Sequence, residues 1–405
     1  MRLIVSRPND SPTETASSTG RRQFLAALVL TAIAIVAFVA VFGLVNRFRS
    51  WQRHLADRLY TQGEQALKVS VPAVAIDDFR SALSFDEDNE RYQFSLAQAL
   101  EADNRVEEAR SYLLDLWDRK PQDGAVNLEL GRLSAQQTVT DRALRYYHNA
   151  IYGLWEKDPE ANRHRARVEL INYLLQRNNR TQAESEIIAM QAGLPADPEL
   201  HAQVAGLFAR IQDYDRALDQ YRHALQLGPK NAHALAGAGD SAFQLGRFRT
   251  AAHYLRSALA QDPHDEHSRQ LLQTASTVLD ANPFAKRLSA RDRENRLRSA
   301  FDVASKKLLV CLDSPSEKNT ASTPTADAQL EKSTQTPDDL EELSKRYKEL
   351  QSKMHSRTFL NDPDSADELM DYVFDIEQRP RNCGPSTPMD EALLLIARYR
   401  SGADR

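Results

Sequence analysis

The sequence contains one cluster of histidines and acids that could hold a metal ion, at residues 264–267 (HDEH). Two histidines three residues apart, with carboxylates between them, are typical ligands of a transition metal. The cluster also falls where we expect a turn between two helices, and there the acids would cap a helix in solvent. We favour the second interpretation and predict no metal site.

Motifs for catalysis are missing from the sequence. It has no phosphate-binding glycine loop, no G-x-S-x-G nucleophile turn, no H-E-x-x-H zinc helix and no C-x-x-C-H haem site. We therefore predict a protein without catalytic residues or cofactors.

Two cysteines, Cys311 and Cys383, are the remaining candidates for chemistry. A single pair without C-x-x-C spacing or nearby histidines is no zinc site. In an oxidising compartment the pair could form one disulfide. The loop-entropy model assigns roughly 4 kcal/mol to closing such a loop. Two unrelated buried thiols are the alternative.

Small residues recur at a fixed interval through the middle of the chain. Six alanines are separated by 34, 34, 40, 34 and 34 residues. Glycines stand twelve residues before three of them, and a large residue follows each alanine by four. Close crossing of two helices requires small side chains, and the large residue fills the adjacent groove. The small positions are Gly63, Ala75, Ala109, Gly131, Ala143, Ala183, Ala217, Gly239 and Ala251.

This period, and segments such as YDRALDQYRHALQLGPKN and FRTAAHYLRSALAQDPHD, resemble the tetratricopeptide repeat family. The resemblance covers residues 56–265, with weaker first and fourth repeats. It implies an all-α fold in which about six helix pairs form a right-handed superhelix, or α-solenoid. It also implies a protein that binds and does not catalyse.

An uncharged run of 22 residues, from Phe24 to Val45, lies near the start of the chain. At about 1.5 Å per residue it is roughly 33 Å long, enough to cross a bilayer. A cleaved signal peptide has a shorter apolar core and a small-residue cleavage site, which this run lacks. We predict a transmembrane helix at 23–46 after a disordered tail at 1–20.

The side of the membrane that the repeats occupy is less clearly encoded. Arginines flank the run on both sides, so the positive charges on the two flanks are nearly equal in number. Taken literally, the positive-inside rule then leans against repeats that lie outside the cytoplasm. GRRQFLA resembles a twin-arginine export motif, although two arginines that anchor a helix explain it more simply. Together with the cysteine pair, this favours a bacterial inner-membrane protein with periplasmic repeats. A cytoplasmic-facing array is the alternative.

Beyond the repeats we expect capping and C-terminal helices at 266–312, a disordered Ser/Thr/Pro linker at 313–337, and a helical segment at 338–405. The last helix, which starts at Pro388, is expected to dock on the helix at 289–312. A disulfide between Cys311 and Cys383 would staple that contact.

In the tetratricopeptide repeat family the first helix of each repeat lines the concave binding face. The resemblance therefore places partner contacts at Phe94, Gln98, Leu128, Arg132, Asn172, Gln176, Arg210 and Asp240. These positions lack the Lys/Asn set that clamps a carboxy-terminal peptide. Apolar residues beside polar ones suit an extended or helical peptide. Ordinary packing between repeats is the alternative for Phe94 and Leu128.

The net charge of −5 and the absence of a basic face argue against nucleic acid. We predict a membrane-anchored scaffold that binds a protein or peptide for assembly or recruitment at the membrane, where tethering raises effective concentration. The alternatives are a structural, oligomeric envelope protein and a non-catalytic accessory subunit of a membrane enzyme complex.

Overall fold

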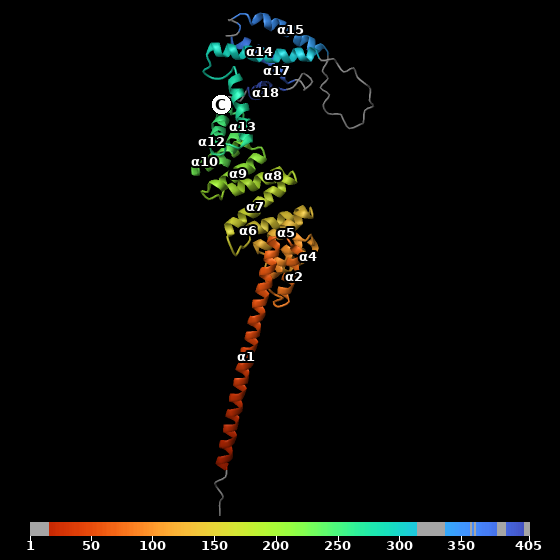
Figure 1. Ribbon diagram of the computed structural model, residues 1–405, viewed down its shortest axis with the longest axis vertical. Coiled ribbons are helices and arrows are strands. Elements are labelled where there is room, and N and C mark those ends of the chain that lie inside the picture. Colours follow the sequence, from red (N-terminus) through yellow and green to blue (C-terminus); the bar gives the residue numbers. More distant parts are fainter. Residues whose placement is uncertain (1–15, 314–336, 357–358, 360–361, 379–385, 401–405) are drawn as a thin grey trace, which may run out of the picture. The chain divides into compact units, whose positions relative to one another are not determined.

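Paired α-helices build the protein in the computed structural model, which describes residues 16–313, 337–356, 359, 362–378 and 386–400 (Figure 1). Within those residues there are seventeen helices and no strand. The chain divides into two units, 1–176 and 177–405. The boundary falls between two helices that the sequence assigns to the fourth repeat.

The first helix, α1, runs without a break from Ala16 to Lys68 (Figure 1). It contains both the predicted membrane span and the first helix of the first repeat. From Leu28 onward it is long and apolar enough to cross a membrane, and its apolar window is not buried by other parts of the protein. The helix begins inside the expected tail at 1–20, because extending a formed helix by a turn is far easier than starting one.

The first unit continues as antiparallel helix pairs. Its core is apolar and includes Tyr60, Phe79, Leu96 and Leu113. The helices after α1 are α2 (Pro72–Leu83), α3 (Glu90–Ala102), α4 (Val106–Arg119), α5 (Gly124–Gln136), α6 (Thr140–Tyr152) and α7 (Pro159–Gln176).

The second unit continues the same alternation and ends in a cap. Its repeat helices are α8 (Arg180–Gln191), α9 (Pro198–Arg210), α10 (Tyr214–Leu227), α11 (Ala232–Gln244) and α12 (Phe248–Gln261), followed by α13 (Glu266–Ala281). The C-terminal helices are α14 (Ala290–Asp313), α15 (Pro337–Lys353), α17 (Pro363–Glu377) and α18 (Pro388–Tyr399).

All nine small residues singled out in the sequence are buried in helices. The six alanines have no exposed surface. A methyl group added at Gly63 would lie 2.6 Å from the Phe79 ring, and one added at Gly239 would lie 2.6 Å from Leu255. The glycines therefore stand where the second helix of the same repeat approaches most closely.

The turn inside each repeat has one residue in the left-handed conformation, five positions before the repeat's alanine. In the second repeat, Asn104 has φ 61° and the Arg105 N–H donates to the Leu100 carbonyl at 2.8 Å. This is the Schellman closure that satisfies the end of a helix. The residues that share the conformation are Ser70, Asn104, Thr138, Asn178, Gln212 and Gly246.

The C-terminal helix α18 packs chiefly on α13 and also contacts α17, with a smaller contact to α14. Our expectation that it docks on the helix at 289–312 was therefore wrong in its main partner. The ring of Tyr399 lies against Gly246, which has no side chain, and its hydroxyl donates to the Gln244 carbonyl at 2.9 Å. The glycine turn of the last repeat thus contacts the last residue of α18.

Helices α14 and α17 are joined by a buried ion pair. Lys307 Nζ lies 2.6 Å from Glu377 Oε2, and the Glu377 side chain has no exposed surface. Burial raises the pKa of Glu377 above its ordinary value, while Lys307 opposes the rise. Cys311 lies one turn after Lys307, half-buried on α14. Cys383 and nearly all of the predicted linker lie outside the described residues, so the disulfide and the linker stay predictions.

Two alanine substitutions test whether the glycines are required by close helix contact. Gly239→Ala should cost about 1–3 kcal/mol, because the methyl group meets the fully buried Leu255. In the neighbouring repeat, Gly206 has its nearest neighbour 3.6 Å from an added methyl. Gly206→Ala should therefore stabilise helix α9 by about 0.5–1 kcal/mol. Urea unfolding measures both; a Gly239→Ala protein as stable as Gly206→Ala would contradict the packing argument.

Candidate functional site

A row of hydrogen bonds crosses the first helices of the first unit. Gln98 on α3 donates to Glu129 Oε1 on α5 at 2.7 Å. Arg132, one turn further along α5, donates to the same Glu129 oxygen at 2.9 Å. It also donates two hydrogen bonds to the Glu169 carboxylate on α7, at 2.8 and 2.6 Å. Paired guanidinium–carboxylate bonds are strong and directional. We call these four residues the polar ladder.

A related contact joins α1 to α3. The Tyr60 hydroxyl donates to Glu64 Oε1 at 2.7 Å and lies 3.1 Å from the Ser95 hydroxyl. The Arg91 guanidinium covers the Tyr60 ring at 4.1 Å from its centroid. The surface that α3, α5, α7 and the end of α1 present through these residues is called the first-helix face.

The ladder follows a register that the repeats set. In each bond between repeats the acceptor, Glu129 or Glu169, lies two residues before the small-residue position of its own repeat. The donor, Gln98 or Arg132, lies one residue after the same position in the preceding repeat. In the second unit the residues two positions before are Gln203 and Gly237, so neither offers a carboxylate for the same bonds.

Carboxylates outnumber cations on the first-helix face. The pKa of Glu101 is raised to about 7, chiefly by desolvation and then by the neighbouring Glu129 charge, whereas Arg132 lowers it by less. Hydrogen bonding to Glu169 raises the pKa of Arg132 and keeps that side chain charged. The charged residues that make the polar contacts of the face are Glu64, Glu101, Glu129 and Glu169, against Arg91 and Arg132, and Lys68 lies beside them at the end of α1.

Two of the partner-contact residues predicted in the first unit, Gln98 and Arg132, belong to the polar ladder, where both donate to Glu129. Leu128 is only 4% exposed and therefore contributes to packing. Asn172 is half-buried on α7, and Gln176 is exposed at the end of the same helix.

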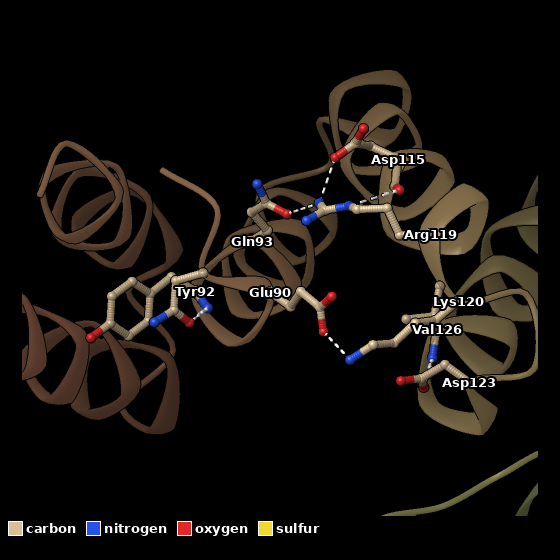
Figure 2. Close-up of polar contacts among 9 residues, drawn as sticks. Glu90, Tyr92, Gln93, Asp115, Arg119, Lys120, Asp123 and Val126 are labelled. Carbon is tan, nitrogen blue, oxygen red and sulfur yellow. Dashed lines mark hydrogen bonds and ion pairs between the residues drawn. The ribbon is translucent and has the colours of Figure 1, made fainter. Parts of the chain in front are cut away.

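Phe94, the remaining predicted residue of the first unit, lines a hollow with a volume of about 720 Å³. The hollow lies where the start of α3, the end of α4, the start of α5 and the α6–α7 loop meet. Figure 2 shows Lys120 reaching from the end of α4 to Glu90 on α3, an ion pair that bridges the two helices of this repeat. We call this hollow the loop pocket.

Two predicted contact residues belong to the second unit. Arg210 is exposed at the end of α9, and Asp240 is half-buried on α11, where Gln244 Nε2 donates to it at 3.4 Å. The sequence argument missed the acids Glu101, Glu129 and Glu169. Their phase relative to the small residues was the signal that would have found Glu129 and Glu169.

No group of three or more His, Cys, Asp or Glu that could hold a metal is found among the described residues. In the HDEH segment, the Asp265 carboxylate accepts the Ser268 N–H at 3.0 Å and caps α13. Hydrogen bonding to Ser268, by its side chain first and its N–H second, lowers the pKa of Asp265. The segment therefore has a structural part in starting a helix.

The stacked helix pairs, with small residues at each crossing, define an all-α repeat protein. Two family models of the tetratricopeptide repeat match the chain, at residues 60–125 and 212–274. The chain therefore contains tetratricopeptide repeats. This fold is typically a non-catalytic protein-interaction scaffold, and the matches indicate no enzyme family.

Several solved structures resemble this chain at low sequence identity. Pseudomonas aeruginosa PilF is 18% identical, with 54% of this chain and 97% of that one covered and a TM-score of 0.39. PilW, described as a type IV pilus biogenesis factor, is 16% identical over 54% and 98%, with a TM-score of 0.39. The C-terminal part of a repeat protein from Cytophaga hutchinsonii is 12% identical over 59% and 93%, with a TM-score of 0.44. No curated protein sequence matches significantly.

The crowded acids of the first-helix face should give the fold a pH dependence. Because the folded pKa of Glu101 is about 7 and its ordinary value is 4.5, the folded state binds this proton more tightly than the unfolded state. Its contribution to stability therefore falls as pH rises from about 4.5 to about 7. Glu101→Gln removes that titration, so the stability of the variant relative to wild type should rise across this interval.

Urea unfolding at several pH values measures the effect, and Glu107→Gln, an exposed acid on α4, is the matched control. Parallel pH profiles for wild type and Glu101→Gln would contradict the assignment.

Proposed function

We propose that this protein is a membrane-anchored scaffold that binds a protein or peptide partner through the first-helix face and loop pocket of its first unit. The observation that carries the proposal is the open loop pocket, held beside a row of fixed polar side chains. Such a combination of apolar wall and ordered polar groups is typical of binding sites. The repeats themselves support a role in protein interaction.

The anchor part of the proposal rests on α1. Its apolar stretch is exposed, while Ala56 and Tyr60 further along the same helix are buried in the first repeat. One unbroken helix would therefore hold the first repeat close to the lipid. A partner captured there is concentrated near the membrane, so modest affinity is enough for recruitment.

We further propose a bacterial inner membrane, with the repeats in the periplasm. The paired Arg21 and Arg22 before the span and the two cysteines support this placement. A cytoplasmic-facing array would bind its partner through the same face.

Site-specific photocrosslinking tests the scaffold in native membranes. A photoreactive residue in place of Gln136, which is exposed on the first-helix face, should give a discrete adduct with a different protein. The same residue in place of Asp118, exposed on the second helix α4, is the matched control and should give little of that adduct. Alkaline carbonate extraction of the same membranes should leave the protein in the pellet, as expected of a spanning helix.

Self-adducts alone from position 136 would support a structural, oligomeric protein and contradict the scaffold. Release of the protein by carbonate would contradict the anchor without affecting the binding argument.

A further inference from the structure

The α6–α7 loop, which supplies one wall of the loop pocket, is fixed in place by main-chain contacts. The Leu154 N–H donates to the Gln122 carbonyl at 2.7 Å, and the Leu154 carbonyl accepts the Gly124 N–H at 2.8 Å. A methyl group at Gly153 would lie 2.6 Å from the Asn149 carbonyl oxygen, so this residue passes where no side chain fits. These contacts hold the loop against the turn between α4 and α5.

Trp155 completes the attachment of the loop. Its indole Nε1 donates to the Ala150 carbonyl at 2.9 Å, and its ring covers Gly124, where an added methyl would overlap the ring. The α6–α7 loop is therefore held in a defined conformation as part of the first unit. It is also where the alanine spacing lengthens from 34 to 40 residues.

On this fixed loop the Leu154 side chain is 66% exposed. It lines the loop pocket of about 720 Å³ and an adjoining hollow of about 470 Å³. The opposite wall is apolar as well, since Phe94, Leu116 and Val126 face the same space. A large apolar side chain held in solvent between two hollows is placed to contact another apolar group.

The acidic and basic side chains that line the loop pocket do not balance once those that already have partners in the protein are set aside. Glu90 pairs with Lys120, and Asp123 caps α5 by accepting the Ala125 and Val126 N–H groups at 2.9 and 3.1 Å (Figure 2). Arg91 also lines the pocket and pairs with Glu64 at 3.8 Å. Among the described residues, the charged lining side chains that have neither an ion pair nor a capping role are two acids and one base. These are Asp88, Glu156 and Lys157.

The neighbouring first-helix face has a smaller bias of the same sign, with four carboxylates against Arg91, Arg132 and Lys68. A cationic ligand group would therefore be favoured at the pocket and along the face beside it, whereas an anionic group would be repelled.

We propose that the loop pocket binds an extended peptide segment of the partner in which a bulky aliphatic side chain is flanked by basic residues. The aliphatic group enters between Leu154 and Phe94, and the basic residues meet Asp88 and Glu156. This inference rests on the proposed function, because it names the class of partner for the same face.

Three labelled decapeptides of glycine and serine probe the pocket in the detergent-solubilised full-length protein. The first has a central leucine between two arginines, the second replaces the leucine with serine, and the third replaces both arginines with glutamate. Fluorescence anisotropy should show the first binding at least about tenfold more tightly than the others, since burying a leucine and pairing the cations both contribute.

The protein variants are Leu154→Ser and, as matched control, Leu227→Ser, which changes a leucine that is 42% exposed on α10. Leu154 is 66% exposed and Leu227 is 42% exposed, so neither is a core residue and neither change should unfold the chain. Leu154→Ser should weaken the first peptide by about tenfold, and Leu227→Ser should not change its affinity. Equal binding of the first two peptides, no binding of the first, or equal affinities of the two variants would overturn the inference.

Crosslinking from position 136 separates this inference from the proposed function. A partner adduct that forms equally in Leu154→Ser and Leu227→Ser would support the scaffold function and contradict peptide binding by the loop pocket. Loss of the adduct in Leu154→Ser alone supports both. Absence of any heterologous adduct in the wild type contradicts the scaffold itself.

Discussion

Close approach of paired helices at small residues is the constraint on which this structure depends. The six alanines have no exposed surface, and a methyl group added at Gly63 or Gly239 would overlap a side chain of the second helix. Because interiors are close-packed, one larger side chain at such a crossing would push the helices apart. Each pair then presents its remaining large residues to the next pair, so burial is shared between neighbouring repeats.

The proposed binding surface arises from this regular helix contact and from one longer repeat that departs from it. Regular stacking places Gln98 beside Glu129 and Arg132 beside Glu169, so a polar ladder forms at a fixed register. The longer third repeat adds a loop that cannot continue the stacking. That loop is instead fastened to the α4–α5 turn and supplies Leu154 to a pocket.

The spacing of small residues was enough to predict the helix pairs, because burial at a crossing requires a particular side-chain size. The start of the last helix at Pro388 was also predicted, and in the structure Thr387 and Asp390 form a reciprocal cap there. The left-handed turn residues were not predictable from composition, since Thr138 and Gln212 adopt a conformation usually left to glycine or asparagine. The docking of Tyr399 on Gly246 depends on a contact between residues far apart in the chain. The path of the α6–α7 loop likewise depends on main-chain bonds that no sequence pattern marks.

Amide hydrogen exchange in two leucine variants of α6 tests the central constraint most directly. Ala143 is fully buried at a helix crossing, and Arg142, one residue earlier, is exposed. Ala143→Leu should speed exchange across both α5 and α6, since overpacking such a contact costs about 1–3 kcal/mol. Arg142→Leu should leave the protection of both helices as it is in the wild type. Equal protection in the two variants would contradict the account, because small size at the crossing would then have no part in holding the helices together.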